Sequence, residues 1–221
     1  MVHAENSSSP NGNTYITGIK TGASGETVQI RLSDGSSFFI HPEKYAELGL
    51  YRDCPVDHDL KEKLQEAATL HSAMRKALQL SARRDHSLYE MRLKLRQREY
   101  PEHIISVVLD KLHGLGICDD RRFAELWLQS RMRKKNEGPV KIKAELAKRG
   151  VDAGIVEELL QDMLGPEQVE EALERATETV LKRCRGDQDR FVRMLQNRGF
   201  SWTLIKKHSI GKFIEYYKDL R

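Results

Sequence analysis

A helical motif occurs three times in this chain at almost constant spacing, and this repeat limits the possible folds more than any other feature. Leu95, Leu146 and Leu195 occupy the same position of the motif, 51 and 49 residues apart. An apolar residue stands four positions before each leucine and an arginine three positions after it: Met91, Ile142 and Phe191, and Arg98, Arg149 and Arg198. A fixed period of this length indicates a supersecondary unit copied in tandem, in which each copy buries its apolar face against its neighbours. Such proteins usually bind elongated partners.

Capping residues and helix breakers divide each copy into three helices. We therefore predict a mainly α fold, in which three tandem three-helix repeats form an extended, curved stack that carries a small N-terminal β-hairpin or sheet. The predicted parts are a disordered tail (1–13), a β-rich extension (14–57), three helical repeats (58–113, 119–164 and 166–212) and a C-terminal helix end (213–221).

The β-rich extension is predicted from a change of period to two. Residues 15–20, 27–32 and 37–40 alternate as short strands do. Asp34-Gly35 is a strong hairpin signal because this dipeptide accepts positive φ. Two or three strands need a covering helix, and residues 43–48 and a long helix from about Asp57 to Ser81 can supply it.

The overall composition places the protein in a reducing, aqueous compartment. Three cysteines, an odd number without metal-ligand spacing, fit reduced thiols. The first residues lack the basic and apolar regions of a signal peptide, and no apolar run approaches the length of a membrane span. We therefore expect a cytoplasmic protein that does not contact the membrane.

We find no catalytic, metal-binding or cofactor-binding pattern in the sequence. Gly114-Leu-Gly116 lacks the continuation of a phosphate-binding loop, and the eight histidines are scattered. Asp119 and Asp120 stand at a helix start, where a carboxylate satisfies free backbone N–H groups. We expect no enzyme activity, no catalytic residue, no metal and no cofactor.

Charge is distributed in alternating blocks. Residues 121–150 have a net charge of +7, residues 151–180 of −8 and residues 181–212 of +7. Such blocks suit a surface that meets both an anion and a basic or mixed protein, although solvated helix faces would produce them as well.

The candidate contacts are basic side chains on rigid helices, together with one tryptophan. Lysine and arginine on such elements can neutralise phosphates and release counterions. The candidates are Arg131, Arg133, Lys134, Lys135, Lys141, Lys143, Lys148, Arg149, Arg193, Lys206, Lys207 and Trp202. For the repeated Arg98, Arg149 and Arg198 a structural role at helix C-termini competes with this interpretation, and it explains their recurrence better.

We expect the two tryptophans to differ in burial. Trp202 corresponds to Ala153 and Glu102 in the other repeats, so its position need not be buried. It is either a partner contact or a ring that packs against Tyr216 and Tyr217. Trp127 stands near Phe123 on an amphipathic helix and is expected in the core.

Several motifs resemble the RecX family of RecA regulators. They are residues 117–127, Ser130-Arg131, residues 138–142, Glu145-Leu146 and residues 148–151, with Arg83-Arg84, residues 87–90 and Lys94-Leu95 in the first repeat. The resemblance covers about residues 60–212. The sequence departs from the family pattern at Glu99, where glycine is preferred, and at residues 134–137, where a glycine-containing linker is usual.

The resemblance implies a non-enzymatic modulator, expected to be a monomer, that docks on the RecA–single-stranded DNA filament. Family members hinder filament extension and curb strand exchange, ATP hydrolysis and repressor self-cleavage, which are steps of DNA repair, recombination and the SOS response. Contact with single-stranded DNA would be weak and independent of sequence.

Two other hypotheses remain open at the level of sequence. Helices 139–149 and 152–163 could form a helix-turn-helix that binds duplex DNA with sequence preference, usually as a dimer. The chain could also be a protein-interaction scaffold that makes no contact with DNA.

Overall fold

The structure, a computed structural model, describes residues 14–219, and the side chains of residues 132–135 lie outside this description. The predicted disordered tail, residues 1–13, also lies outside it. The described chain forms two compact units made of interleaved segments. The first unit comprises the residues up to Arg83 and Lys94–Asp110, and the second comprises Arg84–Leu93 and the residues from Lys111 onward.

The first unit contains a four-stranded antiparallel sheet with the strand order β3-β2-β1-β4. Its strands are β1 (Thr14–Thr21), β2 (Val28–Leu32), β3 (Ser37–Ile40) and β4 (Pro55–Val56). The hairpin predicted at Asp34-Gly35 joins β2 and β3, with Gly35 at φ +86°. The sequence missed β4, because a strand of two residues has no period to detect, and its Pro55 lies at the sheet edge where proline is tolerated.

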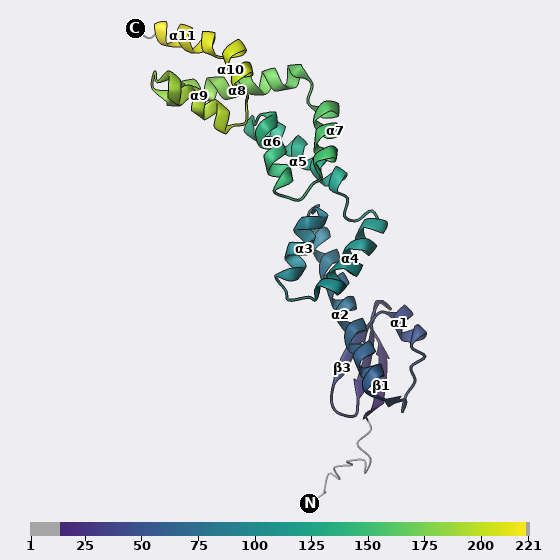
Figure 1. Cartoon of the computed structure of the whole chain (residues 1–221). Coiled ribbons are helices and arrows are strands. Elements are labelled where there is room, and N and C mark those ends of the chain that lie inside the picture. The colour runs from purple at the N-terminus through teal and green to yellow at the C-terminus, as the bar shows by residue number, and fades with distance from the viewer. Residues whose placement is uncertain (1–13, 220–221) are drawn as a thin grey trace, which may run out of the picture. The chain divides into compact units, whose positions relative to one another are not determined.

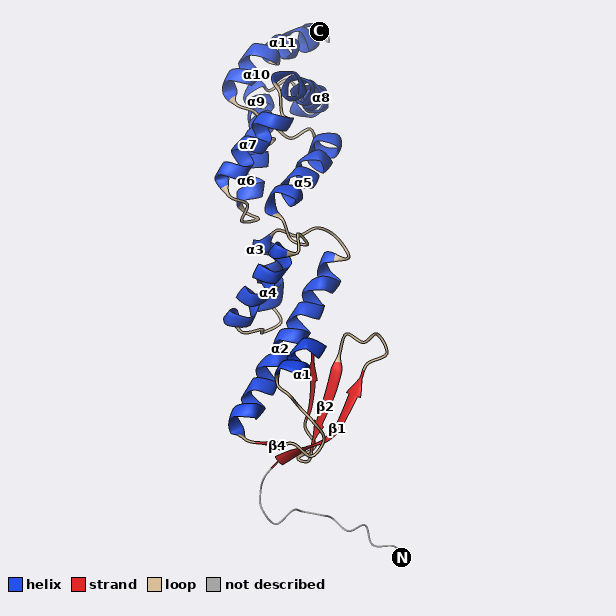
Figure 2. Ribbon diagram, turned by 90° about the vertical axis from the view of Figure 1, so that its right-hand side faces the viewer, coloured by secondary structure: helices blue, strands red, loops and turns tan. Residues whose placement is uncertain are grey.

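One long helix covers the sheet, as expected for a sheet too small to be stable alone. This helix is α2 (His58–Ser81), and the Asp57 side chain caps it by accepting the Leu60 N–H at 2.8 Å. The ribbon of α2 runs alongside the strands (Figure 2). Leu64 and Ala67 of α2 belong to one buried cluster with Ile30 and Ile40 of the strands. The short helix α1 (Pro42–Glu47) connects β3 to this region.

The rest of the described chain is helical, which confirms the predicted mainly α fold with a small N-terminal sheet. The helices that follow α2 are α3 (Leu88–Arg96), α4 (Glu102–Gly114), α5 (Asp120–Lys135), α6 (Pro139–Ala147), α7 (Ala153–Met163), α8 (Pro166–Cys184), α9 (Gln188–Asn197), α10 (Trp202–His208) and α11 (Ile210–Lys218) (Figure 1). No helix in residues 14–219 has the length and apolar character needed to cross a bilayer.

The positions that define the repeat are buried. The leucines Leu95, Leu146 and Leu195 are 0% exposed, and so are the apolar residues four positions before them, Met91, Ile142 and Phe191. In the second unit the repeat positions of the second and third copies lie in two separate buried clusters, one from α5, α6 and α7 and one from α8 to α11. In the latter cluster Phe213 of α11 packs on Phe191 of α9, with ring centroids 5.0 Å apart.

A close backbone contact joins the start of α3 to the end of α6. Ser87, fully buried, donates its hydroxyl to the Arg149 carbonyl at 2.6 Å and accepts the Glu90 N–H at 3.0 Å. Next to it Gly150, at φ +73°, lies so near Tyr89 that a Cβ on Gly150 would be 2.3 Å from the Tyr89 Cβ. Only glycine fits this position, because the backbone is left-handed and the space is already filled.

The same contact recurs one repeat later, between the start of α6 and the end of α9. Gly138 occupies the repeat position of Ser87, and its N–H donates to the Arg198 carbonyl at 2.7 Å. Gly199, at φ +91°, occupies the position of Gly150, and a Cβ there would be 2.4 Å from Lys141. We call these two contacts, Ser87/Arg149–Gly150 and Gly138/Arg198–Gly199, the repeat junctions.

We predict that Gly150→Ala destabilises the protein by roughly 3 kcal/mol, from about 1–2 kcal/mol of left-handed strain and a comparable cost of overpacking. Gly116→Ala is the matched control, because Gly116 has nearly the same backbone conformation (φ +64°) but nothing within 4 Å of a Cβ. It should cost only the strain, about 1 kcal/mol. Urea denaturation of both variants measures the difference, and equal losses would contradict the close approach at the junction.

Candidate partner-binding surface

All twelve candidate contacts belong to the second unit, on four of its helices or at their ends. Arg131, Arg133, Lys134 and Lys135 lie on the last turns of α5, while Lys141, Lys143, Lys148 and Arg149 lie on α6 or directly after it. Arg193 lies on α9, and Trp202, Lys206 and Lys207 lie on α10. The side chains of Arg133, Lys134 and Lys135 are outside the described residues.

Arg131 and Arg149 are engaged by the protein itself. Their guanidinium carbons lie 4.7 Å and 5.0 Å from the centroid of the Trp127 ring, a cation–π arrangement, and both side chains are less than a quarter exposed. Trp127 itself packs partly buried against the α5–α7 cluster, in line with the predicted core position. Arg149 also donates to the Glu145 carbonyl at 2.6 Å, which satisfies a free carbonyl at the end of α6.

This geometry favours the structural interpretation of the repeated arginines. Arg98 makes the equivalent bond in its own repeat, from its guanidinium to the Lys94 carbonyl at 2.7 Å. Both bonds run to the carbonyl four residues earlier, where a cation complements the negative end of the helix. Arg149 in addition lies 3.8 Å from Glu90 of α3, so its charge also contributes to a repeat junction.

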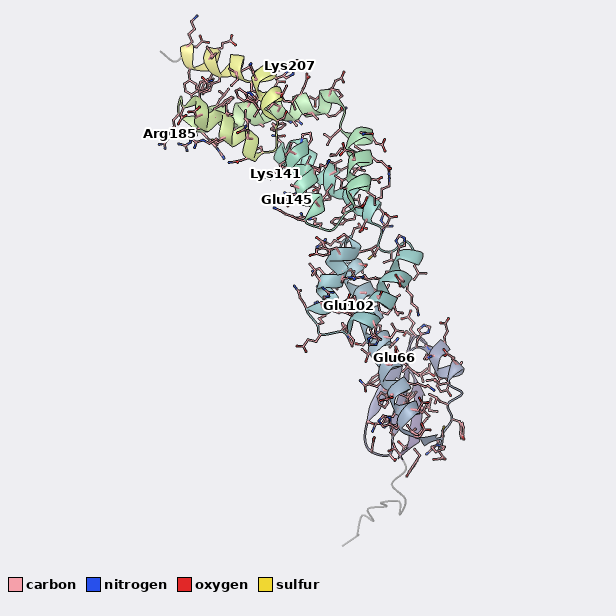
Figure 3. The ribbon with its side chains drawn as sticks, viewed as in Figure 1. Glu66, Glu102, Lys141, Glu145, Arg185 and Lys207 are labelled. Atoms are coloured by element: carbon pink, nitrogen blue, oxygen red, sulfur yellow. The ribbon has the colours of Figure 1, made fainter. Side chains whose placement is uncertain are left out.

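The three lysines associated with α6 each face a carboxylate. Lys141 lies 3.1 Å from Glu137, Lys148 lies 3.3 Å from Glu145, and Lys143 pairs with Glu157 of α7. Figure 3 labels Lys141 and Glu145, which lie one turn apart on α6. The Lys143–Glu157 pair is about half exposed on both sides and contributes only about 0–1 kcal/mol, so Lys143 can exchange its partner for a phosphate at little cost. Glu137 is only 7% exposed, so loss of Lys141 would leave a buried carboxylate poorly compensated.

Several exposed cations without a carboxylate partner lie on α9 and α10 or between α8 and α9. Lys206 and Lys207 are exposed at the C-terminal end of α10 and form no ion pair in the described part of the chain. Arg193 is exposed on α9, and its Nε donates to the Asp189 carbonyl at 3.4 Å. Arg185 and Arg190, which the candidate set omitted, are equally exposed and carry no ion pair in residues 14–219 (Figure 3, Arg185 and Lys207). The +7 charge of residues 181–212 was the signal that pointed to them.

Trp202 is 48% exposed at the first turn of α10. The alternative of packing against the C-terminal tyrosines finds no support in the ring contacts of the described residues. Tyr217 contacts Phe213 and Tyr216 at 5.1 Å and 5.0 Å, and Trp202 takes part in none of these pairs. An exposed indole of this kind is available to a partner.

The aspartates at the start of α5 act as helix caps. Asp119 accepts the Arg122 N–H at 2.9 Å and caps α5 itself. Asp120 instead accepts the N–H of Leu88 at 2.8 Å and caps the start of α3. Burial raises the pKa of Asp120, while the bond from Leu88 opposes this shift. In residues 14–219 no group of three or more His, Cys, Asp or Glu could hold a metal ion.

An acidic surface lies on α8, within the negative block of the sequence. Glu167, Glu170, Glu171 and Glu174 line a hollow of about 380 Å³ together with residues of α10 and α11. Within it Glu170 lies 3.3 Å from His208, and Glu174 pairs with Lys212. The second unit therefore presents an acidic surface on α8 as well as the exposed cations of α9 and α10.

Two profiles of a known family match the helical part of the chain. They are described as the first three-helix domain of RecX, which matches residues 73–112, and the second three-helix domain of RecX, which matches residues 119–160. These matches agree with three-helix domains in the first two of the three predicted copies, while the division into six parts remains a prediction.

Relatives named "Regulatory protein RecX" resemble the chain over most of their length. The protein of Pelodictyon phaeoclathratiforme is 36% identical over 135 residues, which are 61% of this chain and 84% of the relative. That of Clostridium acetobutylicum is 30% identical over 190 residues, 81% of this chain and 87% of the relative. That of Thermus thermophilus is 36% identical over 148 residues, 63% of this chain and 96% of the relative.

Solved structures share the fold. A crystal structure of a regulatory protein RecX superposes with a TM-score of 0.75 at 18% identity, covering 87% of this chain and 97% of the other. RecX from Lactobacillus salivarius gives a TM-score of 0.57 at 25% identity, covering 69% of this chain and 98% of the other.

We predict that Glu145→Gln lowers stability at neutral pH by about 1 kcal/mol and that the loss disappears in acid. Hydrogen bonds from Arg149 and then Lys148 hold the pKa of Glu145 below its ordinary value of 4.5. A lowered carboxylate pKa contributes stability that is present above pH 4.5 and is lost as the pH falls through the pKa of the folded state. Denaturant unfolding from pH 7 down into the acid range measures the difference between wild type and variant.

The matched control for this prediction is Glu174→Gln. Lys212 also lowers the pKa of Glu174, but that pair is exposed to water on α8, which screens it. The control should therefore remain close to wild type at every pH. A Glu145→Gln deficit that stays constant with pH would mean that the charge of Glu145 is not what stabilises the helix end.

Proposed function

The chain belongs to the RecX family, and from this premise we propose that it is a non-enzymatic regulator of RecA that binds the RecA–single-stranded DNA filament. Its effect is to hinder filament growth and thereby to reduce ATP hydrolysis, strand exchange and RecA-assisted repressor cleavage. The protein acts as a monomer in the cytoplasm, and its contact with single-stranded DNA is weak and independent of sequence.

The exposed, unpaired cations of α9 and α10 are the observation that carries this proposal beyond family membership. Lys206 and Lys207 lie on one short helix together with the half-exposed Trp202. Adjacent cations and an aromatic ring suit a partner that offers both phosphates and planar bases, or an acidic protein surface with apolar anchors. A nucleoprotein filament offers both kinds of surface.

The lysines of α6 are assigned a secondary part in this surface. Lys143 is paired with the exposed Glu157, so binding by Lys143 must first break a weak pair, whereas release of Lys141 would leave the buried Glu137 poorly compensated. Arg131 and Arg149, which stack on Trp127, are assigned to the architecture. Arg133, Lys134 and Lys135 remain candidates by sequence.

The helix-turn-helix alternative is disfavoured by the charge of α7, which would be its recognition helix. The exposed face of α7 carries Glu157, Glu158 and Asp162, whose side chains are 53%, 70% and 62% exposed. These carboxylates are paired with Lys143 and Arg121, and α7 itself contains no lysine or arginine, so this face offers nothing that attracts the phosphates bordering the major groove. The start of α6, the other helix of the pair, is occupied by a repeat junction.

The test of this proposal is RecA ATP hydrolysis on single-stranded DNA, titrated with the protein below one molecule per RecA monomer. Wild type should reduce hydrolysis at substoichiometric ratios, because a protein that acts on growing filament affects many RecA molecules. A reduction only when the protein coats the DNA would indicate simple competition for phosphate.

We predict that Lys206→Glu/Lys207→Glu raises the concentration needed for half-maximal inhibition roughly tenfold, since two lost contacts of about 1 kcal/mol each weaken binding by at least that factor. The matched control is Lys111→Glu/Lys218→Glu, which makes the same change of charge at two exposed lysines that also carry no ion pair in the described residues. The control should inhibit like wild type. Full inhibition by the α10 variant would show that α10 does not contact the filament, and the scaffold hypothesis would then require a different surface.

A further inference from the structure

The first unit contains a groove that the proposed RecA interface does not use. It lies between α2 and the edge strand β3, has a volume of about 440 Å³, and is closed at one side by Tyr100. Its lining residues on α2 are Gln65, Ala68, His71, Ser72, Arg75, Lys76 and Gln79, and those on β3 are Ser37, Phe38 and Phe39. Every one of these residues belongs to the first unit.

The groove is cationic. Arg75 and Lys76 are its charged lining residues, and no aspartate or glutamate is among the residues that line it. Neither cation forms an ion pair within residues 14–219, in contrast to Lys61 and Lys63 near the start of the same helix, which face Asp34 and Asp59. Two unneutralised positive charges beside a hollow favour an anionic ligand.

The acidic side chains of α2 lie around a different hollow. Glu62 and Glu66 line a second depression together with residues at the start of α4, and Glu66 lies 3.9 Å from His103 (Figure 3, Glu66). This depression adjoins the groove at Gln65, and Glu26 also acts on His71, so acids near the groove reduce its positive potential without pairing with Arg75 or Lys76.

His71 forms a neutral part of the groove wall. Its ring is buried, and its Nε2 lies 2.9 Å from the Thr27 hydroxyl oxygen on the loop before β2. Burial, and after it the charges of Arg75 and His41, lower the pKa of His71 below 6.5. The ring is therefore uncharged at neutral pH, and the charge of the groove is that of Arg75 and Lys76.

Aromatic and amide groups accompany the two cations. The hydroxyl of Tyr100 lies 2.9 Å from the Ser72 hydroxyl, which holds the Tyr100 ring against α2, whereas the exposed Phe39 alternates with the buried Phe38 and so projects from the sheet face away from α2. Gln65 and Gln79 add side-chain amides that can both donate and accept hydrogen bonds. Proteins that bind single-stranded nucleic acid combine these groups: cations for phosphates, rings for stacking, and amides for base edges.

We propose that this groove binds a segment of single-stranded DNA, with phosphates held by Arg75 and Lys76 and bases placed against the aromatic and amide groups. The choice of DNA as the nucleic acid rests on the proposed function. An acidic peptide could also use the cations, but β3 has only four residues and offers few free backbone groups for an added strand. The Tyr100 ring offers a face on which a base can stack, and a run of carboxylates would leave that face unused.

The experiment measures the binding of a fluorescein-labelled oligothymidylate of about 16 nucleotides, a site size typical of such surfaces, to the full chain by fluorescence anisotropy at several salt concentrations. We expect Arg75→Glu/Lys76→Glu to weaken binding at least roughly tenfold. Removal of two phosphate contacts should also reduce the slope of log K against log salt by about 1.4. Arg75→Gln/Lys76→Gln, which removes charge without reversing it, should give a smaller loss of affinity and the same reduction in slope.

The matched control is Lys20→Glu/Arg52→Glu. These two exposed residues belong to the same unit, carry no ion pair in the described chain and lie outside the groove. The control changes the net charge by the same amount and should keep most of the wild-type affinity. Circular dichroism and thermal unfolding of all variants establish that each is folded.

Three results would overturn the proposal. One is equal loss in the groove and control variants, because binding would then follow net charge alone. A second is unchanged oligothymidylate binding by the groove variants. The third is a groove variant that keeps its affinity for oligothymidylate but loses affinity for a labelled oligoglutamate, which would identify a site for an acidic peptide.

The same variants distinguish this proposal from the proposed function. If the groove variants lose DNA affinity while even wild type has no effect on RecA ATP hydrolysis, the groove stands and the RecA role falls. If wild type inhibits RecA and the groove variants bind DNA normally, the RecA role stands and the groove proposal falls.

Discussion

The repeated architecture depends on a hydrogen bond to a backbone carbonyl at each repeat junction. The carbonyl of Arg149 accepts a hydrogen bond from Ser87, and that of Arg198 accepts one from Gly138. In each case the glycine after the arginine has positive φ and leaves no room for a Cβ. A buried backbone carbonyl without a partner costs about 1–3 kcal/mol. At each junction the chain must therefore place the start of one middle helix within hydrogen-bond distance of the arginine carbonyl at the end of the next. This requirement gives a physical reason for separations as similar as 51 and 49 residues.

Much of the fold was predictable because its signals are local. The side chains of Asp57 and Asp119 cap the helices that the sequence places after them, and the buried leucines follow the helical period. Other features depend on the partner that folding brings near. Asp120 looked like a cap of α5 but caps α3, and that difference depends on a contact between residues 32 positions apart. The position of Glu99 is comparable: it takes φ +61° where the other repeats have glycine, and sequence alone gives no reason for this.

The sequence located the basic segments, but it could not identify which of their cations are free to contact a partner. The charge blocks identified the basic segments, yet they could not separate Arg131 and Arg149, held over Trp127, from the exposed Lys206 and Lys207. Whether a cation is available depends on whether a carboxylate or a ring lies within reach, and such partners come from distant parts of the chain. Lys143, for example, pairs with Glu157 on the next helix. Net charge can be calculated from the sequence, whereas the availability of a cation to a partner depends on which groups the fold places beside it.

The distribution of structural and available residues follows from the repeat itself. Positions that recur, such as the arginine at the end of each middle helix, recur where the helix end has the same local geometry, as the bonds of Arg98 and Arg149 to the carbonyl four residues earlier illustrate. An arginine that makes such a bond cannot also contact a partner without giving up the bond. Recognition is then expected at positions that differ between copies, where packing imposes no side chain. Trp202 is such a position, since the other repeats have Ala153 and Glu102 there. The groove of the first unit is a second example, because its lining residues are not repeated in the other copies.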